Sequence, residues 1–139
     1  MNDKPGAMPI AFSLIHAARI VEERLEAALA EVDLSGPKFT ALSALVAAGE
    51  SMSLSDLAAQ LTCVRSNVTQ LVDRLEADGL VRRVEDPKDR RSVRAEVTRL
   101  GRERQAAGAK LTGKVHAELA KQLSASDREQ FQRALGAIQ

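Results

Sequence analysis

Polar side chains between residues 65 and 74 are the part of this sequence with the clearest capacity for chemical recognition. Arg hydrogen-bonds to guanine, Asn and Gln to adenine, and Ser and Thr to either kind of base edge. The polar members of the stretch are Arg65, Ser66, Asn67, Thr69, Gln70 and Arg74. The apolar residues between them recur at helical spacing, so the polar ones would share the opposite face of a helix. The stretch therefore predicts a helix whose outer face binds the bases and phosphates of DNA.

The charges along this predicted helix agree with an anionic partner at its beginning. The first turn of a helix carries partial positive charge and usually attracts acidic side chains. Here the first turn has Arg65 and no acid, whereas Asp73, Glu76 and Asp78 come later. An ordinary solvated helix face would also be polar, although Glu and Lys would be more common on it. The helix alone therefore leaves both interpretations open.

A charged loop between two short strands is the second candidate for recognition. Residues 80–84 are predicted to form a strand, and residues 93–97 alternate apolar and charged side chains as a half-buried strand does. The Pro- and Asp-containing segment between them predicts a turn. From Arg82 to Arg99 the chain has seven Lys or Arg and four Asp or Glu, a local net charge of +3. The candidate DNA contacts in this loop are Lys88, Arg90 and Arg91.

A protruding loop with paired arginines suits the minor groove of DNA, where the negative potential is enhanced. A solvated charged hairpin would have a similar composition, so the loop alone does not separate the two interpretations. Arg82 and Arg83 could contact either phosphates or acidic neighbours. DNA binding is favoured because the loop directly follows the predicted recognition helix.

Local signals predict the elements that hold these side chains. Ser53 can cap a short helix, with Asp56 three residues later as in a capping box. Residues 62–64 interrupt the helical pattern over the length of a helix-turn-helix turn. Gly79 stands where a glycine commonly ends a helix. The segment from Ser53 to Thr98 is thus predicted to be a helix-turn-helix followed by a two-stranded ribbon.

Further helices are predicted on both sides of this segment. The apolar stripe over residues 10–31 is broad, which suggests burial against more than one neighbour, including another subunit. Pro37 begins a second helix that continues to Ala48. After the ribbon, Thr98 can cap a long helix over residues 99–122.

The C-terminal part of the chain contains glycines and a second capping signal. Gly101, Gly108 and Gly113 weaken the long helix or permit close contact with its neighbours. Ser126 with Glu129 matches a capping box for a short last helix. Such a short helix would be marginal alone in water, so it needs packing partners.

Composition limits the remaining possibilities. With 139 residues, 45% of them hydrophobic, the chain is long enough for one domain with its own core. Its net charge of +1 means that DNA binding would depend on an uneven distribution of charge. One cysteine excludes an intramolecular disulfide, and two histidines without matched carboxylate clusters argue against a metal site. No apolar run suits a membrane span and no signal peptide is visible, so we expect a cytoplasmic protein.

Sequence features of enzymes are also missing. There is no Gly-rich phosphate loop, nucleophile elbow or recognisable pair of buried carboxylates. We therefore expect neither an enzymatic activity nor a cofactor.

The segment resembles the winged helix-turn-helix of the multiple antibiotic resistance regulator (MarR) family. The matching sequences are DLAAQL at 56–61, VTQLVDRLEADGLVRR at 68–83 and DPKDRRSVRAEVT at 86–98. The flanking helices agree in order and length, so the resemblance spans almost the whole chain. It implies a mainly α fold with six helices and a small β wing. Residues 1–139 would form one domain, with a DNA-binding part at 36–98 and dimerisation helices at 9–33 and 99–139.

The resemblance also implies how the protein works. It implies a homodimer on double-stranded DNA, with the recognition helix in the major groove and the wing in the minor groove. A short strand near residues 51–53 would pair with the wing. One of Arg90 and Arg91 would enter the minor groove, while an ion pair between Asp89 and an arginine braces the loop.

The function predicted on this basis is sequence-specific transcriptional regulation. The protein would be a homodimeric repressor of a palindromic operator, released by a small molecule or a redox signal. The alternative is a helical dimer that does not bind DNA and serves in protein interaction or ligand sequestration.

Three residues are candidates to respond to the signal that releases the DNA. Cys63 lies in the predicted turn, where a small buried residue is the ordinary interpretation. The other interpretation of Cys63 is an oxidation switch. The start of the following helix and the charge of Arg65 would favour the thiolate form of this cysteine. His16 and Arg19 are candidates to line the effector cavity that the family often has, and Arg19 suits an anionic ligand. A core or interface role is the other interpretation of His16.

Overall fold

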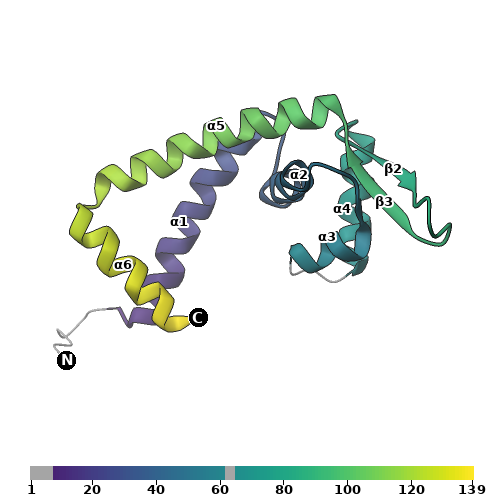
Figure 1. Cartoon of the computed structure of the whole chain (residues 1–139). Coiled ribbons are helices and arrows are strands. Elements are labelled where there is room, and N and C mark those ends of the chain that lie inside the picture. The colour runs from purple at the N-terminus through teal and green to yellow at the C-terminus, as the bar shows by residue number, and fades with distance from the viewer. Residues whose placement is uncertain (1–7, 62–64) are drawn as a thin grey trace.

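The structure, a computed structural model, describes residues 8–61 and 65–139, with the backbone alone at residues 65 and 66. Over these residues, six helices and a three-stranded antiparallel sheet form an elongated molecule with two parts (Figure 1). The lobe consists of α2 (Gly36–Ala48), β1 (Met52–Ser53), α3 (Leu54–Gln60), α4 (Arg65–Ala77), β2 (Val81–Glu85) and β3 (Val93–Val97). The arm consists of α1 (Ile10–Ala30), the distal half of α5 (Arg99–Gln122) and α6 (Ala125–Ile138). The predicted mainly α fold with a small sheet is confirmed.

The hydrophobic core lies in the lobe. Its largest fully buried side chains are Leu42 and Leu45 of α2, Leu57 of α3, Val68, Val72 and Leu75 of α4, and Leu80 and Val81 at the start of β2. α3 begins at its predicted cap, where the Ser53 hydroxyl accepts a hydrogen bond from the Asp56 amide at 3.0 Å. Gly79 follows α4 in the left-handed conformation, with a φ of 75°. The buried positions of α4 lie among the apolar residues that recur at helical spacing in the sequence, so this helix is oriented as expected.

The sheet has the strand order β1-β3-β2, which makes β2 an edge strand. The predicted short strand near residue 52 is present, with Met52 opposite Ala95 of β3. β2 begins at Val81, one residue later than predicted. The reason is that the Leu80 amide still closes the end of α4, where it donates a hydrogen bond to the Leu75 carbonyl at 2.9 Å.

Glycines at two positions let α5 lie close against the lobe. Thr98 caps this helix as predicted, and its hydroxyl accepts a hydrogen bond from the Gly101 amide at 3.0 Å. A Cβ atom at Gly101 would collide with the carbonyl oxygen of Leu80, and one at Gly108 would lie 2.9 Å from an aromatic ring of α2. Nothing lies within 4 Å of such an atom at Gly113. Close packing therefore explains the first two glycines and not the third.

α6 begins earlier than its sequence predicts. The cap is Ser124, whose hydroxyl accepts the Asp127 amide at 3.0 Å while the Asp127 carboxylate accepts the Ser124 amide at 3.4 Å. The predicted capping box of Ser126 and Glu129 is therefore wrong. Both pairs have the same spacing, but the extended conformation of Leu123 ends α5 and lets the next helix begin directly after Ser124.

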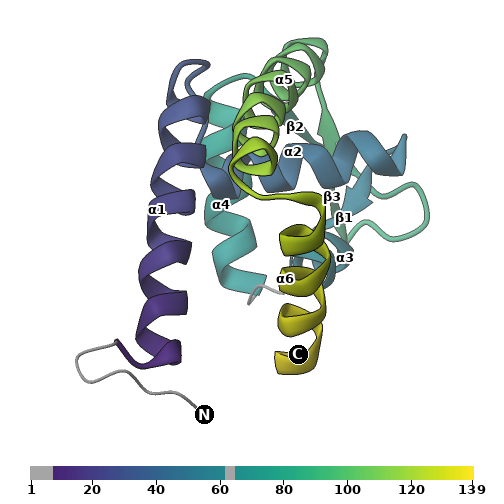
Figure 2. The ribbon, with the colours of Figure 1, turned by 90° about the vertical axis from the view of Figure 1, so that its left-hand side faces the viewer.

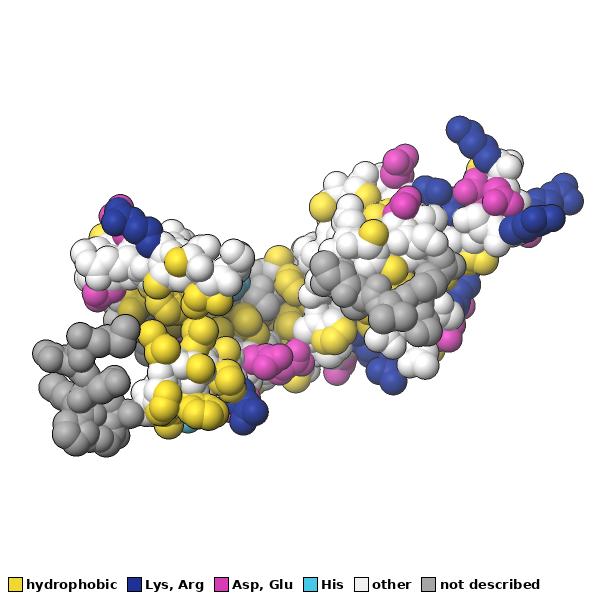
Figure 3. All heavy atoms as spheres, turned by 90° about the horizontal axis from the view of Figure 1, so that it is seen from below, with side chains coloured by type: hydrophobic (Ala, Val, Ile, Leu, Met, Phe, Trp, Pro, Cys, Tyr) yellow, Lys and Arg dark blue, Asp and Glu magenta, His cyan; other side chains and the backbone are white. Residues whose placement is uncertain are grey.

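The arm leaves many apolar side chains exposed. No residue of α6 is buried, and Phe12 of α1 and Ile138 of α6 are 62% and 68% exposed. α1 and α6 extend as separate helices below α5 (Figure 2). Residues of these three helices line a hollow of about 890 Å³. Seen from below, apolar atoms gather over this end of the molecule (Figure 3). No helix in the described part of the chain is both long and apolar enough to cross a membrane.

Candidate DNA-binding surface

The outer face of α4 carries the polar side chains that the sequence singles out. The buried valine and leucine positions of α4 fix the rotation of this helix about its axis. Asn67, Gln70 and Arg74 are exposed on the other side, at helical spacings of three and four residues. The Thr69 side chain is half-buried between the two faces. Three side chains that can bind base edges or phosphates thus project together from one face.

Some of the predicted residues cannot be placed as side chains. Arg65 and Ser66 belong to the first turn of α4, but their side chains lie outside what the structure describes. Cys63 lies outside the described residues altogether. The roles predicted for these three residues stay predictions.

The loop between β2 and β3 carries exposed cations at its tip. Lys88, Arg90 and Arg91 are all exposed, and none has an ion-pair partner among the residues that the structure describes. Lys and Arg side chains stand at the far tip of the lobe in Figure 3. The other cations between Arg82 and Arg99 are all paired with carboxylates. The positive charge that remains available to a ligand is therefore at the tip of the loop.

The aspartates of the loop direct their carboxylates toward the backbone. Asp86 accepts a hydrogen bond from the Lys88 amide at 2.9 Å, and Asp89 accepts one from the Arg91 amide at 3.0 Å. The ion pair predicted between Asp89 and an arginine does not form among the described residues. The loop is instead braced by Asp86 and Arg94, whose charged atoms are 3.6 Å apart. These contacts shape the turn without using the side chains of Lys88 and Arg91.

Arg82 and Arg83 contact acidic neighbours, which decides between the two alternatives left open by the sequence. Arg82 pairs across the sheet with Glu96 at 3.0 Å. Arg83 pairs with two residues of α4, Asp73 at 2.5 Å and Glu76 at 3.1 Å. Partial burial acts to lower the pKa of Arg83, but the hydrogen bonds and charges of Asp73 and Glu76 outweigh it, so the pKa is raised. Both guanidinium groups are thus already neutralised within the lobe.

Arg94 and Glu76 are contributors that the sequence analysis did not identify. Arg94 donates to the Ser51 carbonyl at 2.6 Å and to the Ser51 hydroxyl at 3.0 Å, tying β3 to the segment before β1. Glu76 accepts the backbone amide of Arg83 at 2.9 Å in addition to its guanidinium. The alternation of β3 marks Arg94 as a charged position, but no local signal identifies a partner 43 residues earlier.

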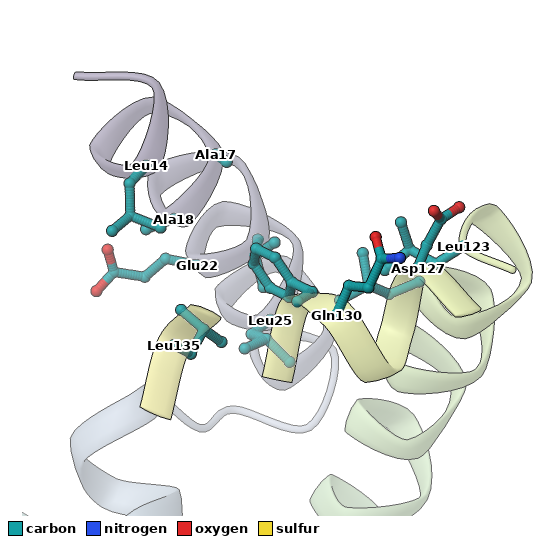
Figure 4. A pocket seen from close by; sticks show the side chains of 12 residues that line it. Leu14, Ala17, Ala18, Glu22, Leu25, Leu123, Asp127, Gln130 and Leu135 are labelled. Carbon is teal, nitrogen blue, oxygen red and sulfur yellow. The ribbon is translucent and has the colours of Figure 1, made fainter. Parts of the chain in front are cut away.

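The hollow between α1 and α6 does not contain the predicted effector residues. Its lining is mainly apolar, with Glu22, Asp127 and Gln130 as its polar members (Figure 4). His16 and Arg19 are exposed on α1 and do not line it. The hollow therefore offers carboxylates rather than the cation that an anionic ligand requires. The effector role of His16 and Arg19 stays a prediction.

Comparison with known proteins gives consistent matches. Residues 34–93 match the model of the MarR family. The uncharacterized HTH-type transcriptional regulator YsmB of Bacillus subtilis is 35% identical over 96 residues, which cover 68% of this chain and 65% of that protein. The transcriptional activatory protein BadR of Rhodopseudomonas palustris is 34% identical over 93 residues, which cover 66% of this chain and 53% of that protein. The chain thus spans less than two thirds of either relative.

A solved structure extends the likeness to the whole chain. The transcriptional repressor CouR, bound to a 23-mer DNA duplex, has a TM-score of 0.84 and 28% identity, covering 99% of both chains. The fold and the exposed polar surface define a winged helix-turn-helix protein. The family model and the similar proteins identify the family within this class: the chain belongs to the MarR family. Members of this family are transcriptional regulators and not enzymes.

Proposed function

We propose that this protein regulates transcription as a homodimer that binds a palindromic DNA site and represses the adjoining promoter. The α4 helix of each protomer lies in the major groove, and the loop between β2 and β3 lies in the adjacent minor groove. The proposed contacts are Arg65, Ser66, Asn67, Thr69, Gln70 and Arg74 of α4, and Lys88, Arg90 and Arg91 of the loop. A protein with this role would act in the cytoplasm, where it could reach its DNA site.

The observation that carries this proposal is the pattern of charge pairing in the lobe. Cations within the sheet are neutralised by Asp or Glu, whereas Lys88, Arg90 and Arg91 at the loop tip are exposed without ion-pair partners in the described chain. Exposed cations on a protruding loop beside a helix with a base-reading face suit simultaneous binding in two grooves. Affinity would come largely from phosphate contacts and fall steeply with salt.

Two observations on the arm support the homodimer. The arm exposes large apolar side chains, including Phe131 at 49% and Ile138 at 68%. The hollow between α1 and α6 is lined largely by apolar residues. Exposed apolar surface of this kind marks an interaction site. A second copy of the chain presents helices with the same apolar faces, and so offers a complementary occupant for the hollow.

The direct test is selection of bound sequences from a random DNA pool at two salt concentrations. We expect a palindrome whose half-sites lie about one helical turn apart. Binding should be weaker at the higher salt concentration because the release of counterions from the DNA then gains less free energy. Failure to enrich any motif at either concentration would contradict the proposal and favour the alternative, a helical interaction module that does not bind DNA.

The direction of regulation needs its own measurement. CouR is a transcriptional repressor and BadR a transcriptional activatory protein, so similar chains act in both directions. Repression predicts that the selected site overlaps a promoter and that added protein lowers transcription from it in a purified system. An increase in transcripts would show activation and would leave DNA binding intact.

Release of the DNA by a small molecule or by oxidation is part of this proposal. For oxidation the candidate is Cys63, and for an anionic ligand the candidates are His16 and Arg19. Peroxide should release the selected duplex from the wild type and not from Cys63→Ser. Equal release from both proteins would exclude the cysteine switch.

A further inference from the structure

Glu76 and Arg83 connect α4 to β2 through several bonds. The Glu76 carboxylate accepts the backbone amide of Arg83 at 2.9 Å and its guanidinium at 3.1 Å. The same guanidinium pairs with Asp73 at 2.5 Å and donates to the Thr69 carbonyl at 3.4 Å. Arg83 thus contacts Thr69, Asp73 and Glu76, which follow one another at spacings of four and three residues along two turns of α4. We call Arg83, Glu76 and Asp73 the bracket.

We propose that the bracket sets the angle between α4 and the β2–β3 wing, so that both enter neighbouring grooves of one DNA. This inference rests on the DNA binding proposed above. It makes Arg83 and Glu76 positioning residues, not DNA contacts. The backbone between the two elements is only residues 78–80, and Gly79 is its central residue. A short connection limits the distance between α4 and the wing but leaves rotation to the side-chain contacts.

The edge position of β2 explains why a carboxylate is needed at this place. β2 pairs with β3 on one side only, so its other side lacks a strand partner. The Arg83 amide is directed to α4, where Glu76 satisfies it. An unsatisfied amide and a partly buried guanidinium would both be unfavourable, so one carboxylate stabilises the strand and the helix together.

The other side-chain contacts between elements of the lobe do not join α4 to the wing. Arg94 ties β3 to Ser51, and Lys38 of α2 pairs with Asp78 at 2.7 Å. Within the described residues, the ion pairs between α4 and the wing all involve Arg83. The bracket is therefore where a substitution would loosen the wing relative to α4 while the core remains intact.

Glu76→Gln distinguishes a residue that positions the wing from one that only repels the DNA phosphates. The two roles predict changes in DNA affinity of opposite sign. Removing a carboxylate near the DNA-binding face reduces repulsion of the phosphates and would tighten binding. Loss of a hydrogen-bonded ion pair should instead loosen the wing and weaken binding roughly tenfold. Fluorescence anisotropy with the duplex selected from random DNA measures this. Glu76→Ala removes both acceptors and should weaken binding at least as much.

Glu96→Gln is the matched control. It removes the same charge from the same lobe, but its partner is Arg82 in the sheet and not a residue of α4. We expect this variant to bind the duplex as tightly as the wild type or slightly more tightly. Amide hydrogen exchange without DNA gives a second readout, in which Glu76→Gln should speed exchange at Arg83 and Glu96→Gln should not.

The outcomes distinguish this inference from the proposed function. A wild type that binds the duplex, with Glu76→Gln binding as tightly or more tightly, would overturn the inference and leave DNA binding intact. Unchanged exchange at Arg83 would overturn it without reference to DNA. A wild type that binds no duplex would defeat the proposed function, and the inference with it.

Discussion

The arginines of the wing differ in what surrounds their guanidinium groups, and this difference decides which of them are available to DNA. Arg83 is held by two carboxylates of α4, and Arg82 by Glu96 across the sheet. Arg90 and Arg91 are exposed at the turn, where Asp89 bonds to backbone instead. Because an ion pair must be broken before a paired arginine can contact phosphate, the tip residues are the favoured contacts.

Substitution of the tip arginines should therefore affect DNA binding and little else. We expect Arg90→Ala and Arg91→Ala to weaken binding of the selected duplex. Each should reduce the slope of log affinity against log salt by about two, because the dimer loses one cation from each protomer. Unfolding free energies should change by less than about 0.5 kcal/mol, because both side chains are exposed surface groups. A salt series of anisotropy titrations measures the slope, and urea denaturation measures the stability.

Arg82→Ala is the comparison for these variants, since its charge is already paired. It should leave the salt slope close to that of the wild type. Equal slopes for the wild type and both tip variants would contradict the placement of the tip in the DNA. A larger effect of one tip arginine would identify the residue that enters the minor groove.

At the scale of elements, α5 joins the lobe to the arm, and its glycines decide how closely it can approach. Gly101 lies against the Leu80 carbonyl and Val97, where a side chain does not fit. Gly113 has open space around the position of a Cβ atom. The same residue type in one helix therefore has opposite consequences at the two positions.

Gly101→Ala and Gly113→Ala test this difference directly. Gly101→Ala should lower the free energy of unfolding by about 1–3 kcal/mol, because an added methyl overpacks the contact between α5 and the sheet. Gly113→Ala should raise it by up to about 1 kcal/mol, because alanine favours a helix interior over glycine. Urea denaturation of both variants measures the two values. A neutral Gly101→Ala would mean that α5 leaves room for a side chain beside Leu80 and Val97, against the close contact proposed.

The start of α6 is also open to test. Ser124→Ala should destabilise the first turn of this helix by about 1 kcal/mol, since the hydroxyl that accepts the Asp127 amide is lost. Ser126→Ala lies within the helix and should have little effect. Hydrogen exchange at the amides of residues 125–128 reports on this turn. Faster exchange in Ser126→Ala and not in Ser124→Ala would restore the capping box first predicted from the sequence.

At the scale of the whole molecule, sequence patterns predict the elements better than the contacts between them. The cap at Ser53, the glycine after α4 and the alternation in β3 are local signals, and each correctly placed its element. The pairing of Arg94 with Ser51 depends on how the sheet assembles, so it could not be read from neighbouring residues. The two overlapping capping patterns before α6 were equivalent in sequence, and only the backbone at Leu123 distinguishes them.

The arm leads to the last prediction, which concerns assembly. A helix as short as α6 with no buried residue is not expected to persist in water by its own propensity, so something must cover its apolar face. Leu135 lines the hollow, whereas Gln132 is exposed on the same helix and does not. A second chain in the hollow would bury Leu135, and a carboxylate at that position would then be costly.

We therefore expect Leu135→Glu to sediment with the mass of one chain, while the wild type and Gln132→Glu sediment with the mass of two. Splitting the dimer removes the gain from binding two half-sites at once, so affinity for the palindrome should fall by at least about 100-fold. Affinity for a single half-site should remain, because the lobe carries the DNA contacts and its own core. Sedimentation equilibrium and anisotropy with both duplexes give these values. A wild type with the mass of one chain, or an unchanged mass for Leu135→Glu, would contradict a dimer that closes over this hollow.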